Sequence, residues 1–384
     1  MISAVRLLPA LPVMLLASVL QPGCAMEQPA PPPPNAAIVY ATLETDPVAS
    51  GDDAADDPAI WVHPDDASRS LVLGTDKQAG LEVYDLQGRR QQFIRAGLTN
   101  NVDLRYLTRS DVGGTAWSAI AAASNRSNNS VSLFAIDRAG QVTWLRSSEI
   151  DTGLTEPYGL CMFRNAAGLQ LFVNDTNGRY QQWLLETASG GASVEPLSVR
   201  ATLLREFAVS SQPEGCVADD ARERLFVGVE NEGIYAFPAS HTESPTQTTV
   251  MEIDDSILAA DVEGMSLYVA GDAGYLVVSS QGNFSYAVYD RLPPFAYRGS
   301  FMVADRPDGS VDGAQETDGL DVSSVPLGSQ FERGLLVVQD GFNTLPDATQ
   351  GFKYIFPGPR SRRPSDCNSI AAELRQNRHE IVLS

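Results

Sequence analysis

Six short phrases of similar composition recur along this chain and constrain its fold more than any other feature. Five are alike in sequence, and the sixth is placed by its spacing. Their third positions are residues 59, 103, 158, 214, 263 and 318, at steps of 44 to 56 residues. Each phrase is followed by further extended apolar runs that end in polar residues. A period of about 50 residues carrying several strands is typical of propeller blades, so we expect an all-β, six-bladed β-propeller forming one domain.

The segment 37–43, AIVYATL, precedes the first phrase. It is predicted to pair with the last blade and so to close the ring without an open sheet edge. The propeller domain is then expected to span residues 37–384. A closed ring needs no partner for its edges, so we expect a monomer.

The first 25 residues have the features of a signal peptide, because Arg6 precedes an apolar stretch from Leu7 to Leu20. That stretch is shorter than the roughly 20 apolar residues of a membrane span, and no later segment is long enough. Cleavage near Ala25 and lipid attachment at Cys24 both stay open. Residues 26–36 are predicted to be a proline-rich spacer. The protein is therefore expected to be secreted, periplasmic or anchored to the outer surface by lipid.

The remaining cysteines are Cys161, Cys216 and Cys367. Three thiols allow at most one bridge within the chain. An exported protein permits such a bridge without requiring it, and the sequence does not single out a pair.

The charge balance excludes several partners. The chain has 27 Lys and Arg against 48 Asp and Glu, a formal net charge of −21. Such a chain repels nucleic acid and anionic membranes. Only two lysines and three scattered histidines are present, which leaves little material for a histidine metal cage. An anionic ligand would therefore need cations to mediate its binding.

Equivalent starts of the inner strands should meet at one mouth of the propeller channel. The third positions include Asp103, Glu214, Glu263 and Asp318, with Asp57, Tyr158 and Asp261 beside them. Carboxylates gathered in one ring repel each other and have raised pKa values unless cations lie among them. Oxygen ligands without His or Cys favour calcium or magnesium, and a loose cluster of many carboxylates suits calcium better.

The phrase DDPAIWVHP at residues 56–64 closely resembles the signature of the β-propeller phytases, which are calcium-dependent enzymes that remove phosphates from inositol hexakisphosphate. Further similar blocks follow in order: NNVDLRY at 100–106, AAASNRS at 121–127, SQPEG at 211–215, DVEG at 261–264, SSQGNFSYAVYDR at 279–291, TDGLDV at 317–322 and VQDG at 338–341. The resemblance covers the chain from about Glu44 to Phe356.

The resemblance implies roles for particular residues. Calcium ligands of the mouth are expected at Asp57, Glu214, Glu230, Asp261, Glu263 and Gln281, further calcium positions at Glu44 and Asp312, and ligands or orienting groups at Asp56 and Asp103. Phosphate contacts are expected from Lys77, Arg126 and Tyr158, which with Glu214 make up the expected catalytic set. The implied activity is a 3-phytase-like hydrolysis of calcium phytate to lower inositol phosphates. Several calcium ions and the attack of a calcium-bound water are expected.

The sequence departs from the family pattern at two places. Gln78 follows Lys77 where family members often have a second lysine, and Thr176-Asn177 replaces a common Lys-Glu pair. Arg179 is expected to supply the missing charge as a substrate contact. These changes predict weaker affinity for highly phosphorylated substrates.

Two alternatives stay open at this point. One is a metal-dependent lactonase or sugar hydrolase on the same six-bladed frame, in which a single metal polarises a carbonyl group. The other is a non-catalytic binding propeller stabilised by calcium. The number of carboxylates, together with Lys77 and Arg126, favours phosphate chemistry.

Overall fold

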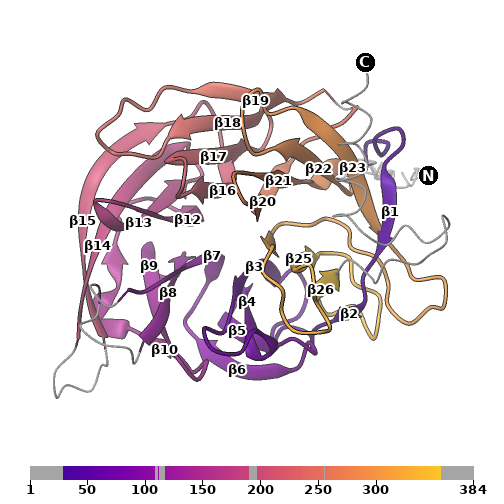
Figure 1. Ribbon diagram of the computed structural model, residues 1–384, viewed down its shortest axis with the longest axis horizontal. Coiled ribbons are helices and arrows are strands. Elements are labelled where there is room, and N and C mark those ends of the chain that lie inside the picture. The colour runs from indigo at the N-terminus through magenta and orange to yellow at the C-terminus, as the bar shows by residue number, and fades with distance from the viewer. Residues whose placement is uncertain (1–28, 109–110, 112–116, 190–196, 255, 356–384) are drawn as a thin grey trace, which may run out of the picture.

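The computed structural model describes residues 29–108, 111, 117–189, 197–254 and 256–355, and the statements that follow concern those residues. Six small sheets are arranged in a ring (Figure 1), which confirms the predicted all-β, six-bladed propeller. The expected signal peptide, Cys24 and Cys367 lie outside the described residues. Within the described part, no helix is both long enough and apolar enough to cross a membrane.

Each blade begins at the channel and its strands follow one another outward. The first three blades consist of β3 (Ala55–Trp61), β4 (Leu71–Asp76), β5 (Gly80–Asp85) and β6 (Arg90–Arg95); β7 (Thr99–Tyr106), β8 (Trp117–Asn125), β9 (Ser130–Asp137) and β10 (Val142–Trp144), with β11 (Ile150–Asp151) beside β9; and β12 (Pro157–Asn165), β13 (Gly168–Asp175), β14 (Arg179–Ser189) and β15 (Leu197–Ala208).

The other three blades follow the same plan, except that the last two each receive one N-terminal strand. They consist of β16 (Pro213–Asp219), β17 (Arg224–Val229), β18 (Gly233–Pro238) and β19 (Thr248–Glu252); β20 (Val262–Ala270), β21 (Ala273–Ser280), β22 (Ser285–Asp290), β23 (Tyr297–Ala304) and β1 (Ala37–Tyr40); and β24 (Leu320–Ser323), β25 (Leu335–Asp340), β26 (Gly351–Ile355) and β2 (Leu43–Glu44).

Ring closure differs in detail from the expectation. The segment 37–43 was predicted to pair with the last blade as a whole. Instead β1 adds a fifth, parallel strand to blade 5, where Ala37 pairs with Phe301. Only the two residues of β2 reach blade 6, where Leu43 pairs with Tyr354 of β26. The N-terminal segment therefore joins blades 5 and 6.

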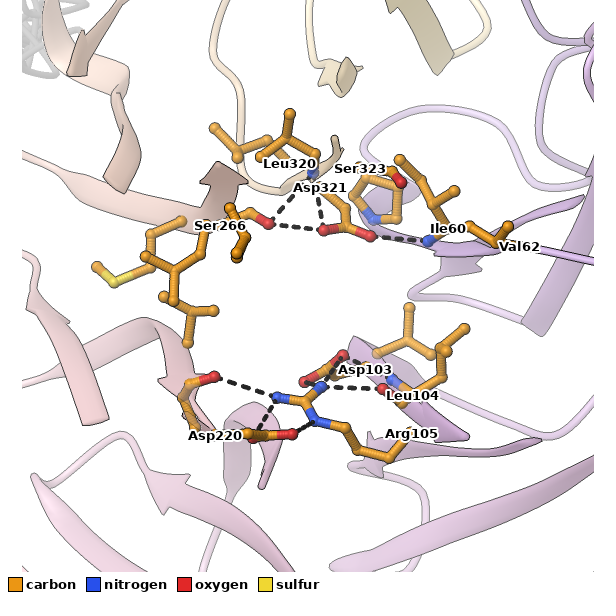
Figure 2. A pocket seen from close by; sticks show the side chains of 18 of the residues that line it. Ile60, Val62, Asp103, Leu104, Arg105, Asp220, Ser266, Leu320, Asp321 and Ser323 are labelled. Carbon is orange, nitrogen blue, oxygen red and sulfur yellow. Dashed lines mark hydrogen bonds and ion pairs between the residues drawn. The ribbon is translucent and has the colours of Figure 1, made fainter. Parts of the chain in front are cut away.

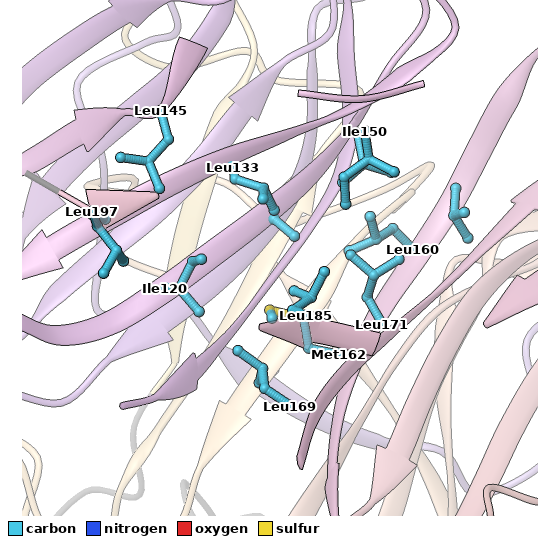
Figure 3. Packing of buried hydrophobic residues seen from close by; sticks show 14 of the residues in the cluster. Ile120, Leu133, Leu145, Ile150, Leu160, Met162, Leu169, Leu171, Leu185 and Leu197 are labelled. Carbon is cyan, nitrogen blue, oxygen red and sulfur yellow. The ribbon is translucent and has the colours of Figure 1, made fainter. Parts of the chain in front are cut away.

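The hydrophobic core is divided among the contacts between blades. Among the described residues, six clusters of buried apolar side chains are found, one between each pair of neighbouring blades. Between blades 2 and 3, Ile120 and Leu133 face Leu160 and Leu171 (Figure 3). Burying one such side chain stabilises the fold by about 1.5–3 kcal/mol. The inner strands are thus held rigidly around the channel.

A bulge interrupts five of the six inner strands near their first residues. In β3, Ala55 pairs with Asp76 and Pro58 with Gly74, so two residues between them have no partner in the ladder. The same break occurs in β7, β12, β16 and β20. A bulge bends a strand and re-aims its side chains. The recurring phrases of the sequence therefore mark bulges at one end of the channel.

Glycine occupies the second bulge position where neighbouring blades approach most closely. A Cβ atom on Gly159 would lie 1.9 Å from the carbonyl oxygen of Glu214, and one on Gly215 would lie 2.1 Å from that of Glu263. Any side chain there would push the next blade outward. Glycine at these positions lets the inner strands converge at the mouth.

A disulfide links Cys161 of β12 to Cys216 of β16, with 5.7 Å between their Cα atoms. The sequence permitted one bridge without selecting it, because the two residues are 55 positions apart. The bond connects the inner strands of blades 3 and 4.

Candidate metal and phosphate site

Six residues, one from each blade, surround the mouth of the channel. Five are the first unpaired residues of the bulges, and the sixth, Asp318, lies just before β24; they are Asp56, Asn100, Tyr158, Glu214, Glu263 and Asp318. The phrase spacing placed residues 59 and 103 at the equivalent positions of blades 1 and 2. The ladder pairing instead gives Asp56 and Asn100, because register is set by cross-strand hydrogen bonds and not by similarity of short phrases.

Three carboxylates form the centre of the mouth. Oxygen atoms of Glu214, Glu230 and Glu263 all lie within 4.8 Å of one another, and all three residues are buried. Gln212 Nε2 donates to Glu230 Oε1 at 2.7 Å. The Oε2 atom of Glu263 has no hydrogen-bond partner among the described residues. Because an unsatisfied buried oxygen is costly, this set of hard oxygen donors fits a divalent cation such as calcium.

The pKa values of these acids reflect their crowding. Burial, together with the charges of Glu214 and Asp261, raises the pKa of Glu230 to about 7, against the lowering effect of the hydrogen bond from Gln212. The pKa of Glu263 lies well above its ordinary value because of burial and then the charge of Glu214. Like charges held together in this way disfavour ionisation. Bound cations would relieve the repulsion.

Lys77 and Gln281 hold the far side of the mouth. Lys77 Nζ lies 2.9 Å from Asp318 Oδ2, 2.8 Å from Asp53 Oδ1 and 3.7 Å from Asp56 Oδ2. Gln281 Nε2 donates to Asp318 Oδ1 at 2.7 Å. Burial lowers the pKa of Lys77, but Asp56 and Asp318 outweigh it and raise the pKa above the usual value. The ammonium group therefore stays charged.

Arg126 and Tyr158 lie on the rim beside the carboxylates. The Arg126 guanidinium carbon is 5.9 Å from the centre of the Tyr158 ring. Its Nε has no hydrogen-bond partner among the described residues, and its nearest acid, Glu156, is 3.9 Å away. Burial, followed by Glu214 and Glu263, raises the pKa of Tyr158 above its usual range, so the phenol stays protonated. Both groups can donate to an anion.

Asp57 and Asp103 have their carboxylates in contacts between blades. Asp57 Oδ2 accepts from the backbone N–H of Val102 at 3.0 Å. Asp103 Oδ2 accepts from Met162 N at 2.7 Å, and both of its oxygens accept from Arg105. The structure thus brings Asp56, but not Asp103, to Lys77 and Glu214.

A cavity of about 860 Å³ occupies the channel beyond the bulges, toward the opposite face. Figure 2 shows Asp103, Arg105 and Asp220 on one of its sides and Asp321 with Ser266 on the other. Arg105 Nε donates to Asp220 at 3.0 Å, so its charge is already paired. The polar side chains that line this cavity therefore differ from those of the mouth.

Glu44 and Asp312 belong to a second acidic cluster in blade 6. Their carboxylates accept hydrogen bonds from Lys353, a residue only 1% exposed. Lys353 Nζ also donates to Asn343 Oδ1 at 2.7 Å and lies 3.3 Å from Asp340. A calcium ion here would compete with the ammonium group for the same oxygens. In this structure the Lys353 ammonium group supplies the positive charge beside both carboxylates.

Arg179, expected to replace a missing charge, is engaged elsewhere. Its guanidinium forms an ion pair with Glu206 at 2.5 Å on the exposed face of blade 3. Thr176 Oγ1 donates to Asp175. Arg179 therefore contributes no unpaired positive charge to this part of the rim.

The phytase family profile matches residues 11–356. The 3-phytase of Bacillus subtilis (strain 168) is 39% identical over 318 residues, which is 79% of this chain and 79% of that protein. The chain belongs to the phytase family. This phytase is therefore a phosphoric monoester hydrolase.

Solved structures resemble this phytase more distantly. A crystal structure of BBS1N in complex with ARL6DN, soaked with mercury, has a TM-score of 0.43, 12% identity and covers 76% of this chain and 75% of that chain. A functionally unknown protein from Desulfotomaculum acetoxidans has a TM-score of 0.42, 15% identity and covers 63% of this chain and 70% of that chain. Likenesses of this degree add nothing about function.

Two residues of the phytase mouth received no role from the sequence. Asn100 Nδ2 donates to Glu214 Oε1 at 3.0 Å and lies 3.5 Å from Asp56 Oδ1. Asp318 was expected at the mouth but was not assigned as a ligand. The signal for Asn100 was its place directly before a recurring phrase, which identifies a functional position only once the bulge is recognised.

Proposed function

We propose that this phytase hydrolyses calcium phytate at the mouth, with several calcium ions held chiefly by Glu214, Glu230 and Glu263. The observation that carries the proposal is the convergence of these three buried carboxylates within 4.8 Å. Gln281 and Asp261 complete the ligand set, since Asp261 lies close enough to raise the pKa of Glu230.

Calcium bound there would neutralise phosphate oxygens and supply an acidified water as the nucleophile. The chain's own residues bind and orient the ester. Lys77 and Arg126 provide positive charge beside the phosphate oxygens, which become more negative in the transition state. Tyr158 donates a hydrogen bond from a phenol that burial keeps protonated. Asp318 and Asp56 fix the position of the Lys77 ammonium group.

The net charge makes cations necessary for this substrate. Phytate is a dense polyanion, whereas the chain has a formal net charge of −21. An uncompensated acidic mouth would repel it at the distances over which surface charges act. Positive ions at the mouth reverse the local sign.

Export of the protein is part of the proposal. The disulfide between Cys161 and Cys216 supports an oxidising compartment, as does the apolar N-terminal stretch of the sequence. Detection of the mature protein outside the cytoplasm, with its N-terminus beginning near residue 25, would test this.

The decisive experiment is phosphate release from calcium phytate by the wild type and by Glu214→Gln, with and without chelator. We expect chelator to abolish the activity of the wild type, and Glu214→Gln to lose at least 100-fold in rate while keeping its fold. Asp272→Asn, at a fully exposed site whose carboxylate pairs with Arg222, is the matched control and should behave as the wild type. A binding propeller without catalysis predicts that Glu214→Gln alters no phosphate release.

A further inference from the structure

The proline-rich segment before β1 holds a single backbone donor over six residues. The sequence Pro29-Ala30-Pro31-Pro32-Pro33-Pro34 has only the N–H of Ala30, because proline nitrogens carry no hydrogen. That one donor bonds to the carbonyl oxygen of Gly282 at 2.8 Å. The segment is thus attached at its far end to a specific point of blade 5.

Gly282 lies in a short turn at the rim of the mouth. This turn, η3 (Gln281–Asn283), connects β21 to β22. Its first residue, Gln281, donates from its side chain to Asp318 at 2.7 Å and from its backbone to the Asp261 carbonyl at 3.0 Å. The turn therefore carries one proposed calcium ligand and contacts another.

The turn is also confined by the segment that precedes β20. A Cβ atom on Gly282 would lie 1.6 Å from the carbonyl oxygen of Ala260. Ala260 and Ala30 thus both contact η3 at Gly282. Removing the Ala30 contact would remove one of these two restraints.

The segment has the length and stiffness of a strut. Pro33 is buried, its carbonyl accepts from Ala36 N at 3.1 Å, and β1 then pairs with β23 at the outer edge of blade 5. Five residues in the polyproline conformation span about 15 Å. The path from β1 over β23 to the turn beside β22 crosses between two and three strand spacings, or about 12 Å. A proline run of this length is therefore sufficient to reach the turn, with only a few ångströms to spare.

We propose that residues 29–35 are a positioning strut of the calcium-binding mouth, with Ala30 as the residue that acts on Gln281 through Gly282. The inference rests on the proposed function, because it takes Gln281 as a calcium ligand. It assigns a role in the site to a segment that the sequence alone identifies only as a spacer.

Ala30→Pro in the full-length chain tests the strut, because it replaces the N–H that bonds to Gly282 by a ring carbon, in a run that is already proline-rich. Ala30→Ser keeps the N–H and is the matched control. The readouts are calcium binding by calorimetry, the calcium concentration for half-maximal phosphate release, kcat at saturating calcium, and Tm in chelator.

For Ala30→Pro we expect the calcium affinity to fall about two- to tenfold, which is the range of one net hydrogen bond. The calcium concentration for half-maximal phosphate release should rise by the same factor. The kcat at saturating calcium and the Tm in chelator should match the wild type, and Ala30→Ser should match it throughout. A lowered Tm in chelator with unchanged calcium affinity would overturn the proposal, because the segment would then serve the fold alone.

Gln281→Ala, measured beside them, separates the two levels of the proposal. Weakened calcium binding in Gln281→Ala together with a normal Ala30→Pro overturns the strut only. Normal calcium binding in both variants overturns the role of Gln281 on which it rests. Phosphate release by the wild type that persists unchanged in chelator overturns the proposed function and the strut with it.

Discussion

Asn100 Nδ2 donates to Glu214 Oε1 at 3.0 Å across the channel, from blade 2 to blade 4. Asn100 is only 1% exposed, and its Oδ1 atom has no hydrogen-bond partner among the described residues. The amide must present its N–H₂ group to the carboxylate, since its oxygen would be repelled there. Asn100 thus orients Glu214. Its own Oδ1 atom is a neutral oxygen of the kind that serves as a calcium ligand.

Replacing Asn100 by leucine should lower phosphate release at least about tenfold, because Glu214 loses its donor and a hydrogen bond to a charged group contributes about 1.5–3 kcal/mol. Steady-state kinetics at several calcium concentrations would measure this. Asn128→Leu, on the hairpin between β8 and β9, is the control and should leave the calcium dependence unchanged. Wild-type kinetics in Asn100→Leu at every calcium concentration would contradict the assignment.

Calcium should stabilise the protein more at pH 8 than at pH 5. Burial and Glu214 raise the pKa of Glu230 from 4.5 to about 7, and those same causes, against Lys77, raise that of Asp318 from 3.8 to about 7. Between about pH 4 and 7 the native state therefore binds more protons than the unfolded state. Without calcium, the contribution of these groups to the free energy of unfolding therefore falls as pH rises through that window. Calcium binding displaces those protons, so the calcium affinity rises over the same window.

Thermal unfolding in chelator and in calcium at both pH values would measure this effect. Glu230→Gln serves as the comparison, because it removes one titrating group and should reduce the difference between the two pH values. If calcium raised the Tm equally at pH 5 and pH 8, these carboxylates would not be the groups from which calcium displaces protons.

Thr176→Lys should lower the KM for phytate by about two- to fivefold, since it adds a cation near the rim in an otherwise acidic field. Arg179 cannot supply that charge while it is paired with Glu206. Thr246→Lys, in the exposed loop of blade 4, controls for the change in net charge. The prediction is wrong if KM for phytate and for a monophosphate ester change by the same factor.

Removing the disulfide should destabilise the protein and weaken the mouth together. Cys216 follows Glu214 by two residues, and Cys161 follows Tyr158 by three, so the bond joins the strands that carry both side chains. The double variant Cys161→Ala/Cys216→Ala should lose about 2–5 kcal/mol in the free energy of unfolding. It should also bind calcium less tightly, as calorimetry would show.

Cys367→Ala leaves this bond intact and is the matched control for the loss of a thiol. Normal calcium affinity in the destabilised double variant would mean that the bond supports the fold without positioning Glu214.

Much of the site could be predicted because a propeller turns sequence repetition into spatial convergence. Glu214 and Glu263 were placed at the mouth from the spacing of their phrases alone. The same spacing failed in the first two blades, where it selected residues 59 and 103 in place of Asp56 and Asn100. A bulge shifts which residue faces the channel, and a linear pattern does not reveal where the ladder is interrupted.

By itself, the sequence determined the blade number, the acidic character of the mouth and the membership of the phytase family, since these follow from period, composition and motif order. Only the tertiary structure decided that Cys161 pairs with Cys216, that Arg179 and Lys353 are already neutralised, and that Ala30 contacts the rim. These are contacts between residues far apart in the chain. Their distances depend on how the blades pack around the axis, because side-chain interactions act over a few ångströms of space and not along the chain.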